Sequence, residues 1–241
     1  MGFATFAIVL SVIDVFSGSS RRSTPVRLVL SRLATEDGRV LWTARLEVPT
    51  DDYRLLATAV AARLRSGYPN LQPRSGGRIA DLPPGVYESY LRLLQRSRTG
   101  TGGKDPELLA ALGALRRRAP GFLETYLLEA RALRQAFYFS KDGALLDRAF
   151  GLLAEAQETA PGDPRVLFER FDLARESGRW RAAEAALATL DDLAPGDPGV
   201  LERQADLAVH RGRKDEALAL MRRAAELHPA FHHLFNLALM E

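Results

Sequence analysis

The chain has 241 residues, of which 46% are hydrophobic and 26% are charged, a balance typical of a folded globular protein with one large or two small domains. The formal net charge is +3, with +4 on residues 1–83 and −1 on residues 84–241, so neither part has the strong basic field of a nucleic-acid-binding module. The absence of cysteine excludes disulfides and thiolate metal sites and is consistent with a cytoplasmic protein.

The first predicted element is a β-strand. Residues Phe3 to Phe16 are apolar except for Thr5, Ser11 and Asp14. This run is too short to cross a bilayer as a helix, and it lacks the basic start and the small-residue cleavage site of a signal peptide. We therefore expect a buried strand and no membrane partner.

A β-hairpin and a helix follow. Apolar and polar residues alternate over 26–48 on both sides of the turn Glu36–Arg39, which contains Asp37-Gly38. Asp51 or Asp52 can begin a helix that runs to about Arg65. Residues 67–83, rich in Pro, Gly and Ser, are predicted to be a linker.

The rest of the chain is predicted to be helical. Apolar residues recur at helical spacing, and Gly and Pro separate the segments. The expected helices are Val86–Gln95, Pro106–Arg118, Phe122–Phe139, Ala144–Thr159, Val166–Glu176, Trp180–Leu193, Val200–His210 and Lys214–Leu227, with a short one over Phe231–Glu241.

These helices follow a repeat of 34 residues. Pro161, Pro195 and Pro229 are spaced by this period, and so are Gly178 and Gly212. The pattern resembles the tetratricopeptide repeat (TPR) family, in which each unit is a pair of antiparallel helices. Phe171 and Leu190 replace residues that are usually small in that family. Pro120 precedes Pro161 by 41 residues, so we expect a longer first helix and a longer loop near residues 138–143.

The N-terminal region has a second resemblance. The string Asp37-Gly38-Arg39-Val40-Leu41-Trp42, followed by Asp51-Asp52-Tyr53, resembles the last part of the TolB-like domain. That domain precedes TPR units in bacterial serine/threonine kinases, adenylate cyclases and winged-helix regulators. Its first βα portion is missing here, which would leave one face of a three-stranded sheet uncovered. We therefore expect a truncated regulator, or a domain that a partner completes.

Catalytic and cofactor motifs are not recognisable. The loop Gly100–Lys104 lacks the first glycine of a phosphate-binding loop and the Ser or Thr after the lysine. His228, His232 and His233 lack a Cys or a well-placed acid to complete a metal site. The sequence predicts no catalytic residue, no cofactor and no metal.

The TPR resemblance implies that the first helix of each unit lines a concave groove for a protein or peptide segment. The residues that it places there are Arg131, Arg134, Gln135, Phe168, Asp172, Arg175, Glu176, Glu202, Asp206 and His210. Phe168 is the one large apolar residue of this set and the expected anchor. An ordinary solvated helix surface would have a similar pattern.

The expected fold is α+β: a partial TolB-like region over 1–66 with a small antiparallel sheet and one helix, a linker over 67–83, and an all-α TPR solenoid over 84–241. The leading hypothesis is a non-catalytic cytoplasmic scaffold that binds a protein or peptide and no nucleic acid. One alternative is the regulatory portion of a bacterial kinase, cyclase or winged-helix regulator. Another is a homo-oligomer formed through the N-terminal sheet.

Overall fold

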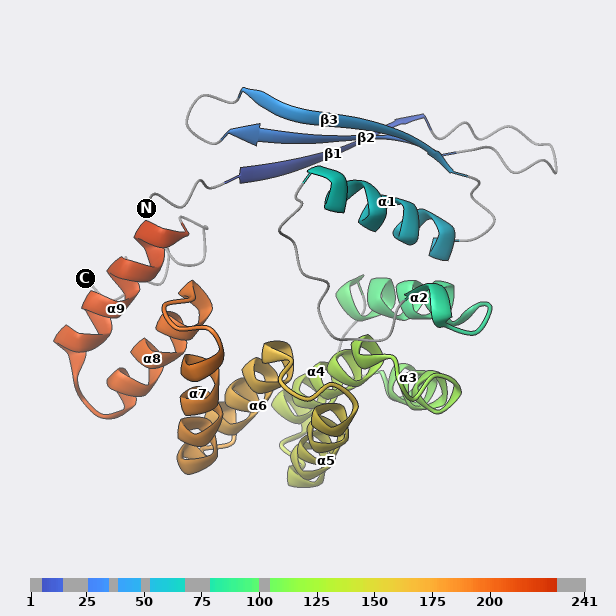
Figure 1. Cartoon of the computed structure of the whole chain (residues 1–241). Coiled ribbons are helices and arrows are strands. Elements are labelled where there is room, and N and C mark those ends of the chain that lie inside the picture. The colour runs from blue at the N-terminus through green and yellow to red at the C-terminus, as the bar shows by residue number, and fades with distance from the viewer. Residues whose placement is uncertain are drawn as a thin grey trace. The chain divides into compact units, whose positions relative to one another are not determined.

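The computed structural model describes residues 6–14, 26–34, 39–48, 53–67, 79–99 and 105–228. They belong to two compact units, Met1–Leu91 and Arg92–Glu241, whose elements are labelled in Figure 1. Several predicted features lie outside the described residues: the hairpin turn before Arg39, the helix start at Asp51 or Asp52, most of the linker, the loop Gly100–Lys104, and everything from Pro229 onward, including His232 and His233.

The N-terminal unit contains a three-stranded antiparallel sheet. Its strands are β1 (Phe6–Asp14), β2 (Val26–Ala34) and β3 (Val40–Val48), in the order β1-β2-β3. The central strand is in register with both neighbours, since Leu30 lies opposite Leu10 on β1 and opposite Ala44 on β3. The predicted strand and the antiparallel pairing of the two hairpin strands are therefore confirmed, whereas the burial of β1 remains a prediction.

One face of the sheet packs against α1 (Tyr53–Gly67), as Figure 1 shows. Leu28 and Leu30 of β2 are buried, whereas Thr43, Arg45 and Glu47 of β3 are exposed on the opposite face. This alternation is the period-2 pattern of a strand with one solvated face. Pairing of the sheet with a second copy would use a strand edge rather than this face, and that alternative remains a prediction.

The end of α1 is fixed to the sheet by a close approach. Gly67 lies against the Trp42 ring, and a Cβ added at Gly67 would be 2.9 Å from Trp42 Cδ2. The Arg32 guanidinium of β2 donates a hydrogen bond to the Gly67 carbonyl over 3.1 Å. A glycine is needed here because no side chain fits between the helix backbone and the indole.

Two helical elements complete the N-terminal unit and lead into the second. The 3₁₀ turn η1 (Ile79–Asp81) precedes α2 (Val86–Thr99), which crosses the boundary between the units. An apolar groove of about 320 Å³ lies between α1 and the first turns of α2, lined by Leu56, Ala57, Val60, Ala61, Leu64, Tyr87 and Leu91.

The second unit is a succession of antiparallel helix pairs (Figure 1). Its helices are α3 (Pro106–Arg118), α4 (Leu123–Ser140), α5 (Gly143–Thr159), α6 (Pro164–Glu176), α7 (Trp180–Leu193), α8 (Pro198–His210) and α9 (Lys214–Leu227). The tightest pairs are α4 with α5, α6 with α7 and α8 with α9. These helices confirm the α+β prediction with an all-α repeat solenoid, whereas the domain boundaries 1–66, 67–83 and 84–241 remain a prediction.

Small side chains stand where paired helices approach each other. Ala149, Ala183 and Ala217 are 34 residues apart and have no exposed surface. Phe171 and Leu190, the two departures from the family pattern, are also fully buried. The solenoid therefore accommodates both larger side chains in its core.

The repeat unit between Pro120 and Pro161 is longer than 34 residues because both of its helices, α4 and α5, are longer than those of the next unit. α4 has 18 residues against 13 in α6, and α5 has 17 against 14 in α7. The expected longer loop is wrong, since only Lys141 and Asp142 connect the two helices. Lys141 closes α4 in the left-handed region with φ 58°, and Asp142 accepts a hydrogen bond from the Ala144 backbone.

We predict that Gly67→Ala loosens the contact between α1 and β3. The added methyl group would overlap the Trp42 ring, and overpacking of this kind costs about 1–3 kcal/mol. Hydrogen exchange of the α1 and β3 amides should become faster. The matched control is Gly151→Ala in α5, where an added Cβ meets nothing within 4 Å and a stabilisation of about 0.5–1 kcal/mol is expected. Unchanged exchange in α1 would contradict this account of Gly67.

Candidate functional site

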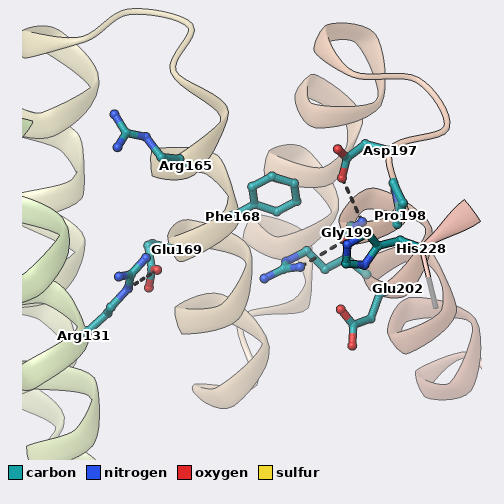
Figure 2. Close-up of a pocket in the computed structure, with 10 residues that line it drawn as sticks. Arg131, Arg165, Phe168, Glu169, Asp197, Pro198, Gly199, Glu202 and His228 are labelled. Carbon is teal, nitrogen blue, oxygen red and sulfur yellow. Dashed lines mark hydrogen bonds and ion pairs between the residues drawn. The ribbon is translucent and has the colours of Figure 1, made fainter. Parts of the chain in front are cut away.

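A groove of about 510 Å³ lies on the face where the first helices of the three pairs, α4, α6 and α8, follow one another. Figure 2 shows Arg131, Glu169 and Arg165 on the α4 and α6 side, and Asp197 and Glu202 on the α8 side, where His228 at the end of α9 also contributes. The lining residues are Arg131, Arg165, Phe168, Glu169, Asp197, Pro198, Gly199, Glu202, Arg203 and His228.

The repeated Asp-Pro phrase positions two walls of the groove. Asp163 and Asp197 each begin a helix, and their side chains accept hydrogen bonds from the backbone amides of Arg165 (3.0 Å) and Gly199 (2.8 Å). These are ordinary N-caps with proline in the first turn. The two phrases differ at the next residue, because Gly199 occupies the repeat position of Arg165.

Gly199 makes room for an aromatic side chain. Figure 2 shows the Phe168 ring extending from α6 toward α8. A Cβ at residue 199 would lie 3.4 Å from the ring atoms Cε1 and Cζ, and 3.1 Å from Asp197 Oδ1. The Arg203 guanidinium lies over the same ring, 4.5 Å from its centroid, in a cation–π contact. The partly buried Phe168 therefore forms an apolar floor between polar walls.

Arg165 is held firmly at the other wall. Its guanidinium donates to both oxygens of the buried Asp163 carboxylate, at 2.8 Å for Nη2 to Oδ2, and also bonds Glu124 of α4. Hydrogen bonding to Asp163, reinforced by Glu124, raises the pKa of Arg165 above its ordinary value despite desolvation. This arginine is charged at every accessible pH and joins α4 to α6.

Ion pairs connect each first helix to the next. Arg131 of α4 bonds Glu169 of α6, and Arg134 bonds Glu176 over 2.7 Å. Between α6 and α8 the charges are exchanged. The later helix α8 supplies the arginine, Arg203, and α6 supplies the carboxylate, Asp172, at 2.8 Å. These pairs are partly shielded from solvent, so they contribute orientation as well as modest stability.

Asp206 of α8 has an unfavourable electrostatic position. Its Oδ2 is 3.4 Å from Arg175 Nε, a loose contact, while Glu202 lies one turn away on the same helix. Desolvation raises the pKa of Asp206, and the negative charges of Glu202 and Asp172 raise it further against the opposing effect of Arg175 and Arg203. The ionised form of the Asp206 carboxyl is therefore less favourable in the folded chain than in water.

The predicted groove residues are only partly brought together. Arg131, Phe168 and Glu202 line the groove, and Asp172 and Arg175 belong to the ion pairs beside it. Gln135 is exposed on α4. His210 lies at the opposite end of α8 and stacks on Trp180 of α7, with ring centroids 3.6 Å apart. The remaining predicted residues, Arg134, Glu176 and Asp206, form ion pairs between helices.

Other lining residues were not predicted. They are Arg165, Glu169, Asp197, Pro198, Gly199, Arg203 and His228. Glu169 and Arg203 are 34 residues apart and have opposite charge. Arg181 and Asp215 also have opposite charges at equal repeat positions without lining the groove, so this signal alone does not identify the lining residues.

A buried carboxylate joins the helices next to the groove. Glu129 of α4 is fully buried, and its oxygens accept hydrogen bonds from Arg116 of α3 (3.1 Å) and Arg148 of α5 (2.6 Å). Arg116 also donates to Glu155 over 2.8 Å and lies 5.3 Å from the centroid of the Tyr126 ring. Because charges this deep must be paired, this cluster fixes α3, α4 and α5 together.

Comparison with solved structures identifies the fold of this scaffold. The chain is similar to TTC0263, a thermophilic TPR protein in Thermus thermophilus, with a TM-score of 0.58, 19% identity, and coverage of 78% of this chain and 95% of that one. It is also similar to MamA, residue 41 to the end, from Desulfovibrio magneticus RS-1, with a TM-score of 0.50, 14% identity, and coverage of 66% and 85%. No protein-family model and no curated protein matches the sequence. The helical repeats therefore form a TPR solenoid.

Metal sites and membrane spans are absent from the part of the chain that the structure describes. No group of three or more His, Asp or Glu side chains in this part could hold a metal ion. Within the same residues, no helix is long and apolar enough to cross a membrane.

We predict that Glu129→Ala destabilises the solenoid by about 3 kcal/mol, because it leaves the partly buried Arg116 without its buried partner. The matched control is Glu155→Ala, which removes the other carboxylate bonded to Arg116. Since the Glu155 side chain is 53% exposed, its loss should cost less than about 1 kcal/mol. Urea unfolding followed by far-UV circular dichroism compares them, and equal losses would contradict the assigned role of burial.

We predict that Asp206→Asn is at least as stable as the wild-type chain at neutral pH. The folded chain raises the pKa of the Asp206 carboxyl, so the folded state binds its proton more tightly than the unfolded state does. The resulting loss of stability is complete above the raised pKa and disappears as the pH falls toward 3.8, the ordinary pKa of the group. The difference between variant and wild type should therefore shrink on acidification. Urea titrations across this pH range measure it. A variant that is less stable at neutral pH would mean that the Arg175 ion pair outweighs desolvation.

Proposed function

We propose that this chain is a non-catalytic scaffold that binds a protein or peptide segment in the groove lined by α4, α6 and α8. The observation that carries the proposal is the groove itself, in which a partly buried aromatic floor lies between charged walls. Preformed grooves of this kind bind an extended segment through an apolar anchor and polar contacts at its edges. The TPR fold supports the same role, since stacked repeats create extended binding surfaces.

The rigidity of the groove favours this function. The Arg131–Glu169, Arg165–Asp163 and Arg203–Asp172 pairs hold its walls before any partner arrives. Binding of a partner then costs less conformational entropy, because the scaffold is already ordered. Of the predicted groove residues, we assign contact with the partner to Arg131, Phe168 and Glu202, and we assign positioning of the walls to Asp172 and Arg175.

A second candidate is the regulatory portion of a bacterial signalling protein in the cytoplasm. The order of the units, an α/β unit followed by helical repeats, supports it, as does the resemblance to the TolB-like domain. Trp42, which belongs to that resemblance, holds the end of α1. An immunoblot of the native source with an antibody to residues 160–241 separates the two. A band near 26.5 kDa favours a free-standing scaffold, whereas a much larger band favours a regulator.

We predict that the groove selects peptides from a random nonapeptide library displayed on phage. The immobilised full chain should enrich binders that protect α6 and α8 amides from hydrogen exchange. Phe168→Ala should weaken these binders by about tenfold or more, because it removes the apolar floor. The matched control is Tyr138→Ala, which truncates a 66% exposed aromatic residue at the far end of α4. Equal effects of the two variants, or no enrichment, would contradict binding in this groove.

A further inference from the structure

The charges that line the groove balance one another. The lining carries three guanidinium groups and three carboxylates, which cancel when His228 is neutral. These groups belong to Arg131, Arg165 and Arg203, and to Glu169, Asp197 and Glu202. The groove as a whole therefore offers a ligand no excess of either sign.

The individual charges of the lining also have partners within the chain. The three guanidinium groups form the pairs Arg131–Glu169, Arg165–Asp163 and Arg203–Asp172. The Asp197 carboxylate accepts a hydrogen bond from the Gly199 amide over 2.8 Å, and Glu202 also has an interaction within the chain. A charged side chain that entered the groove would lose hydration and would have to compete with these partners, so the groove favours an uncharged ligand.

The centre of the groove is suited to an apolar side chain. The partly buried Phe168 ring and Pro198 line it, and Gly199 adds no side chain between them. The Arg203 guanidinium lies over the Phe168 ring, but its side chain is only 16% exposed and therefore presents little charge to a ligand. A large aliphatic or aromatic side chain of a partner can pack here as an anchor.

Arg131 can donate to a ligand although its charge is paired. Its hydrogen bond to Glu169 uses Nε, and the Arg131 side chain is 50% exposed. A guanidinium has five N–H donors, so among the described residues the Nη1 and Nη2 groups of Arg131 are left for a second acceptor. Figure 2 shows Arg131 on the α4 side of the groove that contains Phe168. The carbonyl oxygen of an extended peptide is an uncharged acceptor for these donors.

We propose that the partner segment is uncharged where it occupies the groove. One large apolar side chain packs on Phe168 and Pro198, and a neighbouring backbone carbonyl accepts a hydrogen bond from the Nη groups of Arg131. This assignment rests on the proposed peptide-binding function and specifies its ligand. A segment that places a charged side chain in the groove is the opposing possibility, and it would have to replace one of the existing ion pairs.

The first test uses the nonapeptides that the full chain selects from the phage library. Asp, Glu, Lys and Arg should be depleted next to the apolar anchor of the enriched peptides. The affinity of the matching synthetic peptides should change by less than about twofold as ionic strength rises from about 0.05 to about 0.5 M, because salt screens charge–charge attraction and leaves apolar packing in place.

Two substitutions of Arg131 separate hydrogen bonding from charge. Arg131→Gln removes the charge but keeps an amide donor, whereas Arg131→Met removes both. We expect the selected peptides to bind about threefold more weakly to the first variant and about tenfold or more weakly to the second, since only the second leaves the peptide carbonyl without a donor. The matched control Arg181→Met, an exposed arginine of α7 outside the groove, should bind like wild type. Far-UV circular dichroism checks that each variant is folded.

The alternative outcomes overturn different statements. Enrichment of acidic or basic residues next to the anchor, or a loss of affinity of about tenfold at the higher ionic strength, would overturn the uncharged partner. The groove would remain a peptide site if binding still depends on Phe168. Equal losses in the two Arg131 variants would overturn the contact with a backbone carbonyl. Failure to obtain any peptide whose binding depends on Phe168 would overturn both the uncharged partner and the peptide-binding function.

Discussion

The arrangement of the solenoid depends on the close approach of paired helices at buried alanines. A two-helix unit cannot bury its apolar side alone, so each pair must stack on the next. Ala149, Ala183 and Ala217 lie at one repeat position and allow this approach with no exposed surface. Because this contact recurs, the first helices α4, α6 and α8 follow one another along one face, and their polar side chains meet there.

The polar residues of that face differ in how their charges are balanced. Arg165 with Asp163, and Arg203 with Asp172, join successive helices and keep the walls in place. Asp206 differs from them, because burial and the nearby carboxylates Glu202 and Asp172 raise the pKa of its carboxyl and so penalise its ionised form. That face therefore combines a rigid frame with one locally unfavourable charge.

The elements were predictable from the sequence, whereas the groove was predictable only in part. The 34-residue period places the helices, and α7 and α9 agree with their predicted bounds. The capping phrases Asp163-Pro164 and Asp197-Pro198 begin α6 and α8, two residues before the predicted starts at Val166 and Val200. Repeat position indicates which helix faces the groove, but not which turn of that helix lines it. His210, predicted for the groove, lies at the other end of α8 from the lining residues and stacks on Trp180. The Trp42–Gly67 contact depends on tertiary packing, and no local pattern predicts it.

The difference between Gly199 and Arg165 has an evolutionary consequence. Both residues follow the same Asp-Pro phrase at the same repeat position, yet one leaves space above Phe168 and the other fills its position with a guanidinium. Codons for glycine and arginine are interconverted by a single base change. A duplicated repeat can therefore gain or lose a recognition surface in one mutational step, while the alanines that hold the array together remain as they were.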